Sequence, residues 1–379
     1  MSITQVFESA GARRARPLAI ILFLVAASAS ALATETKSCI PTFPFVQGWW
    51  GADAAYSIPF PDGRSVWIFG DTLYGKDRFV EGNNPRMVRN SIGISTCDAA
   101  GNWKLDYIIR KDEAGQPRDF FQARDKSYWY WALDGFLHRD NLWVTLVCIR
   151  DKPVETSAAL AFQTCGTDLA KVSNLSAPAP QWKVEILPLV PDGAKAYPSA
   201  TAVVEGDYAH IFAVYEKDPR PMLLVRIPLD GLKAPRENLQ YLADDGTWKP
   251  GFDPAHAKYV MVPGGSEMSV RYHTDLKKWV AVMNEPRFPS HNVVVRTAPK
   301  LTGPWTEGKV IYQIPDMQPS APAYDRDTFC YAAKEHPEFE KPGQLLFTYV
   351  CNTLAVPKIV TNTTIYFPKT VIVPMPTDE

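Results

Sequence analysis

Residues 50–72 have the sequence WGADAAYSIPFPDGRSVWIFGDT. Two runs of apolar, aromatic and β-branched residues, 54–60 and 65–69, flank a short Pro-Asp-Gly segment centred on Asp62. Runs of this kind on either side of a tight turn predict an antiparallel β-hairpin. This hairpin is the unit on which the fold prediction is built.

Four further strand pairs follow along the chain, and each surrounds its own turn: 130–137 with 142–149, 200–204 with 210–215, 268–272 with 278–283, and 329–334 with 345–350. The five turns are centred near residues 62, 140, 206, 276 and 340, at intervals of 78, 66, 70 and 64 residues. A repeat of this length with about four strands is typical of a β-propeller. The predicted fold class is therefore all-β, a five-bladed β-propeller with four-stranded antiparallel blades around a central channel. Two β-sandwiches would explain the number of strands but not the regular interval, and only residues 111–126 suggest a short helix.

The composition excludes several classes of protein. The chain has 379 residues, of which 46% are hydrophobic, so it is neither disordered nor fibrous. Its 40 Lys and Arg balance 41 Asp and Glu, giving a net charge of -1. Nucleic-acid-binding proteins normally carry a basic excess, so we expect no nucleic-acid partner.

The first 33 residues have the features of a secretory signal. Basic residues, including Arg13 and Arg16, precede an apolar run over residues 18–33, which ends in an Ala-Leu-Ala cleavage pattern. An uncleaved anchor is the alternative, although sixteen residues are short for a bilayer span. We therefore predict a signal peptide at residues 1–33, a single propeller domain at residues 34–379, and a secreted or periplasmic monomer without a membrane span.

Six cysteines lie after the predicted cleavage site. An even number of cysteines in an exported chain predicts disulfides, although six residues allow fifteen pairings. Proximity in sequence favours Cys148–Cys165 and Cys330–Cys351, which would leave Cys39–Cys97.

Hairpin geometry brings acidic residues together. Residues opposite each other in a hairpin are equidistant from the turn, so Asp53 should lie opposite Asp71. Their Cβ atoms would then be about 5 Å apart, and the pKa of one carboxyl should rise. About residue 276, the same reasoning places Glu267 opposite Glu285. Neighbouring carboxylates with separated pKa values can divide acid and base roles, and we predict Asp53, Asp71 and Glu267 as catalytic residues.

In a propeller the inner strands of all blades begin at one rim of the channel. That rim should also collect Arg150, Asp151, Glu216 and the aromatic residues 128–131. Carboxylates and aromatic rings in one funnel suit a sugar ligand. The predicted substrate-binding residues are Arg89, Asn90, Trp129, Tyr130, Tyr197, Glu285 and His336.

Structural roles compete with these functional ones. Asp71 could be a turn residue, and Glu216 a solvated loop charge. The aromatic residues 128–131 could belong to the core, Arg89 could cap a strand, and His336 could plug the far end of the channel.

Other chemistries lack their motifs. The sequence has no Gly-x-Ser-x-Gly elbow with a matching His, no HExxH pattern and no phosphate-binding Gly-rich loop. We therefore expect no metal site, and no cofactor is required.

The block at residues 50–53, the block at residues 62–72 and Arg89-Asn90-Ser91 together resemble the opening of a secreted five-bladed propeller family. That family was formerly catalogued as a domain of unknown function and is linked to endo-D-arabinanases. Residues 296–298, 302–305, 331–333, 336–337 and 347–352 are also similar to it and, more distantly, to arabinanase and β-xylosidase propellers. The resemblance implies glycoside hydrolysis, with Asp53 and Asp71 at the family's acidic positions and Glu267 as a third acid.

The functional hypothesis is thus a secreted glycoside hydrolase that acts on a furanoside or related polysaccharide or oligosaccharide. Two alternatives remain open: a carbohydrate-binding propeller without catalysis, and a structural envelope scaffold, since fold alone does not fix function.

Overall fold

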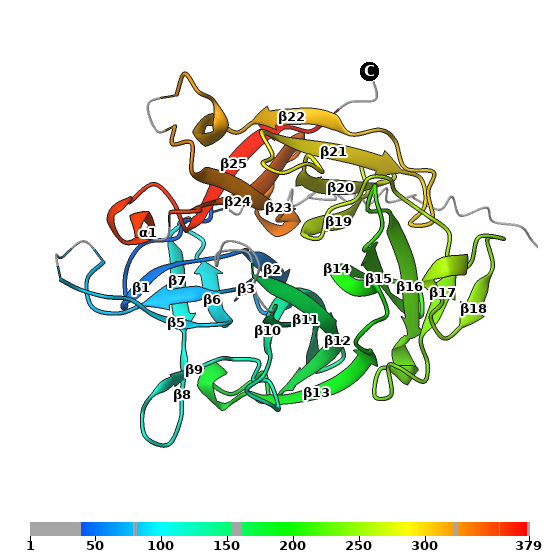
Figure 1. Ribbon diagram of the computed structural model, residues 1–379, viewed down its shortest axis with the longest axis horizontal. Coiled ribbons are helices and arrows are strands. Elements are labelled where there is room, and N and C mark those ends of the chain that lie inside the picture. Colours follow the sequence, from blue (N-terminus) through cyan, green and yellow to red (C-terminus); the bar gives the residue numbers. More distant parts are fainter. Residues whose placement is uncertain are drawn as a thin grey trace, which may run out of the picture. The chain divides into compact units, whose positions relative to one another are not determined.

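The computed structural model describes residues 39–78, 80, 82–152, 161–321, 324–355 and 357–376. The predicted signal peptide lies outside the described residues. Those that are described belong to one compact unit, Lys37–Glu379, and its long elements are strands (Figure 1). The all-β prediction is confirmed for this part of the chain.

The first hairpin has the predicted register. Strands β2 (Tyr56–Pro59) and β3 (Arg64–Phe69) pair antiparallel, with Ser57 opposite Trp67. Strands β6 (Ser91–Cys97) and β7 (Trp103–Ile108) complete a sheet of order β2-β3-β6-β7. The apolar runs form the strands, and the Pro-Asp-Gly segment forms the turn between them.

Four more antiparallel sheets follow in sequence order. The second contains β10 (Trp129–His138), β11 (Asn141–Asp151), β12 (Phe162–Ser173) and β13 (Lys183–Val190). The third contains β14 (Ala196–Glu205), β15 (Tyr208–Tyr215), β16 (Met222–Pro228), β17 (Gln240–Leu242) and β18 (Trp248–Pro250). The fourth contains β19 (Met268–His273), β20 (Lys278–Asn284), β21 (Asn292–Ala298) and β22 (Lys309–Gln313). The fifth contains β23 (Thr328–Glu335), β24 (Gln344–Thr353) and β25 (Pro368–Pro374).

The expected four strands therefore occur in the first, second and fourth sheets, while the third has five strands and the fifth has three. Shorter elements flank this series. They are β1 (Trp49–Ala52), β4 (Thr72–Tyr74) and β5 (Arg86–Val88), which form a small sheet, and the ribbon of β8 (Arg110–Lys111) with β9 (Pro117–Arg118). The 3-10 turns are η2 (Ala179–Gln181), η3 (Leu229–Gly231), η4 (Pro254–His256), η5 (Pro315–Met317) and η6 (Pro337–Phe339).

The helix expected over residues 111–126 is wrong. The β8–β9 ribbon occupies its first half, because Gly115 has a φ of +76° and Asp112 accepts the backbone N–H of Gln116, which closes a tight turn. Within the described ranges α1 (Lys358–Thr361) is the only α-helix, and no helix there is long and apolar enough to cross a membrane.

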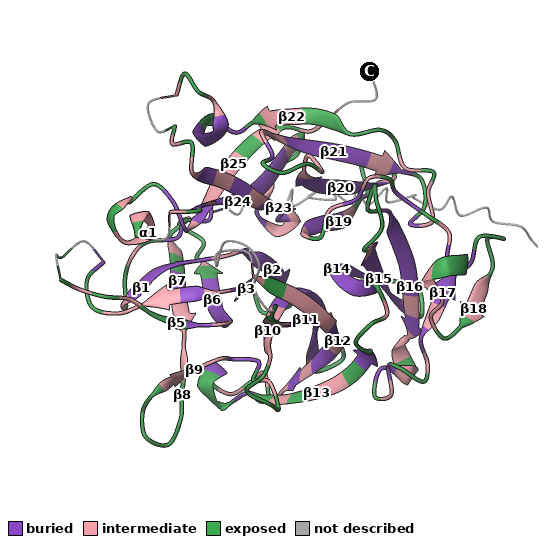
Figure 2. Ribbon diagram, in the orientation of Figure 1, coloured by how far each residue is buried: buried purple, intermediate pink, exposed green. Residues whose placement is uncertain are grey.

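Apolar clusters join each sheet to the next. The core between the first two sheets includes Ile68 and Leu146, and the core between the second and third includes Trp143 and Ile211. Equivalent clusters join the third sheet to the fourth and the fourth to the fifth. A further cluster places Trp67 of the first sheet with Leu346 of the fifth. Figure 2 shows the consequence: inner strands such as β15 are buried, while outer strands such as β22 are exposed along much of their length.

Three disulfides reinforce the sheets. Cys39–Cys97 ties the N-terminal segment to the end of β6, Cys148–Cys165 joins β11 to β12, and Cys330–Cys351 joins β23 to β24. These are the pairs that sequence proximity favoured. Three disulfides are consistent with an extracellular location.

Candidate active site

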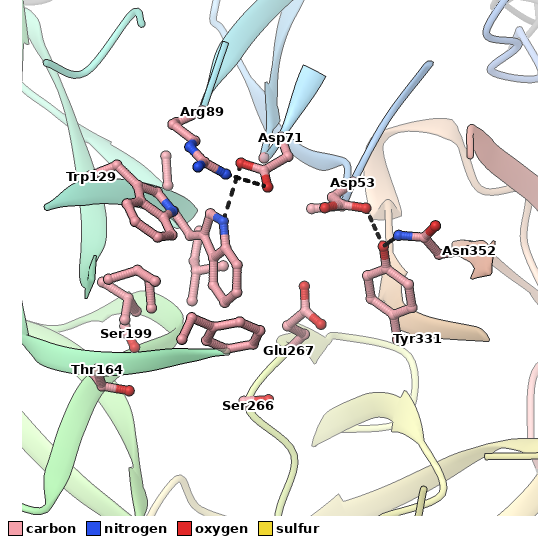
Figure 3. Close-up of a pocket in the computed structure, with 18 of the residues that line it drawn as sticks. Asp53, Asp71, Arg89, Trp129, Thr164, Ser199, Ser266, Glu267, Tyr331 and Asn352 are labelled. Carbon is pink, nitrogen blue, oxygen red and sulfur yellow. Dashed lines mark hydrogen bonds and ion pairs between the residues drawn. The ribbon is translucent and has the colours of Figure 1, made fainter. Parts of the chain in front are cut away.

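A pocket of about 690 Å³ lies where the inner strands begin. Its lining comes from all five large sheets: Asp71 from the first, Trp129 from the second, Tyr197 from the third, Glu267 from the fourth and Tyr331 from the fifth. Figure 3 shows side chains from these separate sheets pointing into one space. The predicted convergence of the inner strand ends is therefore observed.

Asp53 and Asp71 are neighbours in the backbone, as the hairpin register predicted. The Asp53 N–H donates to the Asp71 carbonyl at 3.1 Å, and the Gly70 N–H donates to the Asp53 carbonyl at 2.9 Å. Gly70 permits this approach, because a Cβ atom at this position would lie 3.2 Å from the Asp53 Cβ. The strand ends therefore place both carboxyl groups at the mouth of the first hairpin.

Asp71 is held between a cation and an indole. Its Oδ2 lies 3.2 Å from Arg89 Nη1, and its Oδ1 accepts a hydrogen bond of 3.3 Å from Trp131 Nε1. Arg89 also stacks on the ring of Trp129, 4.1 Å from its centre. Burial raises the pKa of Asp71 to about 6, although Arg89 and Trp131 oppose the rise. Asp71 is therefore ionised at neutral pH and still close enough to titration to exchange a proton.

Asp53 occupies a more enclosed position. Its carboxylate accepts a hydrogen bond from the Tyr331 hydroxyl, which in turn accepts a bond of 3.2 Å from Asn352 Nδ2. Burial, followed by the charge of Asp71, raises the pKa of Asp53 well above its usual value. Both carboxyl groups therefore have raised pKa values, and the charge of Asp71 contributes to the rise at Asp53.

Glu267 approaches from the fourth sheet, one residue before β19. Its Oε1 lies 4.0 Å from Lys334 Nζ, and its side chain is 25% exposed. Lys334 is 1% exposed, has no hydrogen-bond acceptor, and sits 3.6 Å from the centre of the Tyr56 ring. Burial raises the pKa of Glu267 and lowers the pKa of Lys334 to about 8.

The structure brings together six of the ten residues predicted for the site, which line the pocket: Asp53, Asp71, Glu267, Arg89, Trp129 and Tyr197. Of the wider rim set, Asp151, Glu216 and Trp131 also line it. Arg150 does not, because it turns to Asp192 at 2.8 Å.

Three predicted ligand-binding residues lie outside the pocket lining. Asn90 is fully buried and donates to the carbonyls of Phe121 and Tyr130 at 3.1 and 2.9 Å. The ring of Tyr130 is buried, and its hydroxyl donates to Asp168 rather than facing the pocket. His336 is fully buried, and its ring nitrogens lie 2.7 and 2.8 Å from the hydroxyls of Ser57 and Thr348. It therefore fills the interior, which agrees with the alternative in which His336 plugs the channel.

Glu285 is also displaced from its predicted place. In the fourth hairpin His273 pairs with Lys278 and Met268 with Met283, so the position opposite Glu267 is Asn284. A shift of one residue sends a side chain to the other face of a strand. Glu285 accordingly lies outside the pocket lining, where it accepts a bond of 2.8 Å from Asn292 and pairs with Arg287 at 3.2 Å.

Sequence reasoning missed Lys334, Tyr331 and Tyr366 as parts of the site. Tyr366 lines the pocket, and its hydroxyl donates to the Asp71 carbonyl at 3.0 Å. Lys334 had a signal, since it precedes Glu335 and the two are the charged residues at the end of an otherwise uncharged strand. Tyr366 had none, because it lies in an irregular segment between α1 and β25.

Groups of residues spaced to ligate a metal lie outside this pocket in the part of the chain that the structure describes. The pocket instead presents carboxyl groups and aromatic rings. Trp131 and Phe162, with ring centres 4.7 Å apart, form an aromatic wall beside Asp71. This arrangement can donate and accept protons next to a surface that suits the apolar face of a sugar.

Comparisons with known proteins agree with this fold. A family model described as "Domain of unknown function (DUF5005)" matches residues 42–373. No curated protein matches the sequence. A Bacteroides ovatus protein provisionally described as a hydrolase has 17% identity and a TM-score of 0.63, over 90% of this chain and 87% of that chain.

Other similar structures are glycoside hydrolases. A GH43_1 enzyme from Xanthomonas citri, solved with xylotriose, has 12% identity and a TM-score of 0.49, over 89% of this chain and 91% of that chain. A xylan β-1,4-xylosidase from Bacillus halodurans has 11% identity and a TM-score of 0.41, over 88% of this chain and 54% of that chain. Among these three structures, the Bacteroides ovatus protein shows a shared fold by its TM-score.

Proposed function

The chain belongs to the DUF5005 family, and from the site it carries we propose that it is a glycoside hydrolase acting on a furanoside or related polysaccharide. One observation carries the proposal. Carboxyl groups from two separate sheets, Asp53 and Asp71 from one and Glu267 from another, line a single pocket with aromatic walls. Glycoside hydrolysis uses an ionised and a protonated carboxyl on either side of the scissile bond.

The electrostatics suggest how the roles divide. Asp71, paired with Arg89, supplies the negative charge and either activates water or attacks the anomeric carbon. Glu267, whose pKa is raised by burial, gives its proton to the leaving oxygen as the glycosidic bond breaks. Burial and the charge of Asp71 raise the pKa of Asp53, which favours the protonated form of Asp53 beside the ionised Asp71.

The walls of the pocket support a carbohydrate as the substrate class. Trp129, Trp131 and Tyr197 offer ring faces of the kind that pack against sugars. Within that class we favour arabinan, on the resemblance of the Phe-Gly-Asp-Thr block to the endo-D-arabinanase family.

The architecture that supports the site is proposed to be a five-bladed propeller formed by residues 34–379. The apolar cluster of Trp67 with Leu346 supports closure between the last sheet and the first. The bond between Ser57 and His336 joins the same two sheets at 2.7 Å. Residues 1–33 are proposed to direct export, which agrees with the three disulfides.

The test is hydrolysis of arabinan and xylo-oligosaccharides by the purified protein, compared with Asp71→Asn and Glu267→Gln variants. We expect release of reducing ends by the native protein, and a loss of about 10²-fold or more in each variant. Asp140→Asn, in the turn between β10 and β11, and Glu205→Gln, at the end of β14, change exposed residues at the strand ends away from the pocket. They serve as matched controls and should retain full activity.

Two outcomes would overturn the proposal. Equal turnover by the native protein and both pocket variants would remove the carboxyl groups from the chemistry. Sugar binding without turnover, unchanged in both variants, would favour a non-catalytic carbohydrate-binding propeller.

A further inference from the structure

A second polar cluster lies at the other end of the inner strands. β19 begins beside Glu267 and ends at His273, and β23 begins beside the pocket and ends at Glu335. Six strand residues span roughly 20 Å, so this cluster is separate from the pocket. Glu340, which follows the turn η6, completes it.

Three potential ligand atoms meet there. One atom each from His273, Glu335 and Glu340 lie within 4.8 Å of one another. A single ion with bonds of about 2.0–2.4 Å holds its ligand atoms at such separations. The imidazole Nε2 of His273 faces Glu335 Oε1 directly, while the backbone N–H of Leu346 fixes Glu340 Oε1 at 2.8 Å. The side chains are thus positioned by the fold.

An unpartnered oxygen points to a missing ligand. The Glu335 side chain is fully buried, yet its Oε2 has no hydrogen-bond partner. A buried carboxylate oxygen without a partner costs free energy, and a second carboxylate beside it adds repulsion. The Arg271 guanidinium, whose charge interacts with Glu335, is engaged with both oxygens of Asp134 at 2.9 and 3.0 Å. A cation bound between the carboxylates would give Glu335 Oε2 a partner and would also offset the repulsion between the two carboxylates.

We propose that His273, Glu335 and Glu340 form a binding site for a first-row divalent transition metal such as Zn²⁺, which links the fourth sheet to the fifth. An imidazole with two carboxylates suits Zn²⁺ or Mn²⁺ better than Ca²⁺ or Mg²⁺, which prefer all-oxygen sites. The second group with metal-like spacing, Asp316 with Cys330 and Cys351, is excluded because its cysteines form a disulfide.

The role of the ion is structural. It joins the end of β19 to the segment after β23, two elements that otherwise meet at this end through the His273–Glu335 contact. Binding to the folded chain alone stabilises it by mass action. The proposal does not depend on the activity assigned to the pocket.

The test measures bound metal and stability in the purified protein. After treatment with EDTA, the protein is dialysed against ZnCl₂, MnCl₂ or CaCl₂. The number of metal ions bound per chain is then measured by inductively coupled plasma mass spectrometry. We expect about one zinc per chain and a melting temperature raised by at least about 2 °C, with weaker binding of manganese and none of calcium.

Variants identify the ligands. Glu335→Gln and His273→Gln should each lower the affinity for zinc by about tenfold or more. His256→Gln is the matched control, because His256 pairs with Asp253 at 2.7 Å on the exposed surface and should not affect the bound zinc. If a ligand variant fails to fold, the visible absorption of Co²⁺ bound to the native protein reports imidazole and carboxylate ligation directly.

The proposal is overturned if the native protein retains no stoichiometric zinc and its melting temperature is unchanged. That result would mean that a protonated imidazole and a shared carboxyl proton neutralise the cluster. Equal zinc content in the native protein and both ligand variants would also overturn it, as would binding of calcium alone.

Discussion

Lys334 Nζ lies 4.0 Å from Glu267 Oε1, buried against the ring of Tyr56 and without a hydrogen-bond acceptor. A lysine in this position acts by its charge rather than by a bond. Its charge lowers the pKa of Glu267, which burial raises, and it also lowers the pKa of Asp53. The amino group therefore lowers the pH at which the proposed acid gives up its proton, against the larger effect of burial.

Replacing Lys334 by Met should shift the pH dependence of hydrolysis. Without the cation, the pKa of Glu267 rises, so the proton donor stays protonated to higher pH. The alkaline limb of the kcat/KM profile should move upward by roughly one pH unit. Lys300→Met, at an exposed position, is the control and should leave the profile unchanged. An unmoved alkaline limb in Lys334→Met would separate Lys334 from the chemistry.

Removal of the Arg89 charge should move the acid limb of the kcat/KM profile. Arg89 lowers the pKa of Asp71, which burial raises to about 6. In Arg89→Gln that pKa rises further, so the ionised base is lost at higher pH. We expect the acid limb of the profile to move upward from near pH 6 by roughly one unit. Arg287→Gln removes a comparable ion pair with Glu285 outside the pocket, and a shift of equal size there would contradict the assignment.

Asp71 should also govern how stability depends on pH. The pKa of Asp71 is about 6 in the folded protein, whereas an unperturbed Asp carboxyl, as in the unfolded chain, has a pKa of 3.8. Between these two pH values the folded chain holds a proton that the unfolded chain releases. The stabilising effect of this proton is complete below 3.8 and is lost as the pH rises through about 6. Asp71→Asn mimics the protonated form, so it should be more stable than the native protein at pH 7 by on the order of 1–3 kcal/mol, with little difference at pH 4.

Urea denaturation at both pH values measures this difference, and Asp140→Asn is the control. A stability difference between Asp71→Asn and the native protein that is the same at pH 4 and pH 7 would show that the carboxyl does not titrate between them. Activity and stability should change in opposite directions, as expected for a residue retained for function.

The hairpins were predictable because apolar runs flank short turns, and the first turn is also unambiguous in register. Pro-Asp-Gly fixes the first register, and from it the pairing of Asp53 with Asp71 follows directly. Centring the fourth turn on residue 276 placed Glu285 opposite Glu267, whereas the observed register places Asn284 there, a difference of one residue. The fifth inner strand has a register shift between Tyr331 and Lys334, which turns Lys334 inward toward Tyr56. Bulges of this kind depend on packing between sheets, which the local sequence does not specify.

The burial of His336, Asn90 and Tyr130 was unpredictable for a related reason. Each polar group finds partners on strands distant in sequence, such as Ser57 for His336. A polar residue near a strand end has the same pattern whether it faces a ligand or a buried hydroxyl. Only the assembled sheets distinguish the two environments.

Gly51 links the fold to the pocket through Tyr366. A Cβ atom at Gly51 would lie 1.8 Å from the backbone oxygen of Tyr366, and its φ of +139° is also unfavourable for other residues. Gly51→Ala should therefore displace Tyr366, whose hydroxyl donates to the Asp71 carbonyl, and destabilise the protein by roughly 3 kcal/mol or more.

Gly63→Ala is the matched control, because Gly63 also has a positive φ, +84°, but has open space around it, so only the backbone cost of about 1 kcal/mol is expected. The two variants are compared by urea denaturation and by kcat/KM. Equal losses of stability in both would mean that the contact with Tyr366 relaxes freely, and that this segment does not fix the position of Asp71.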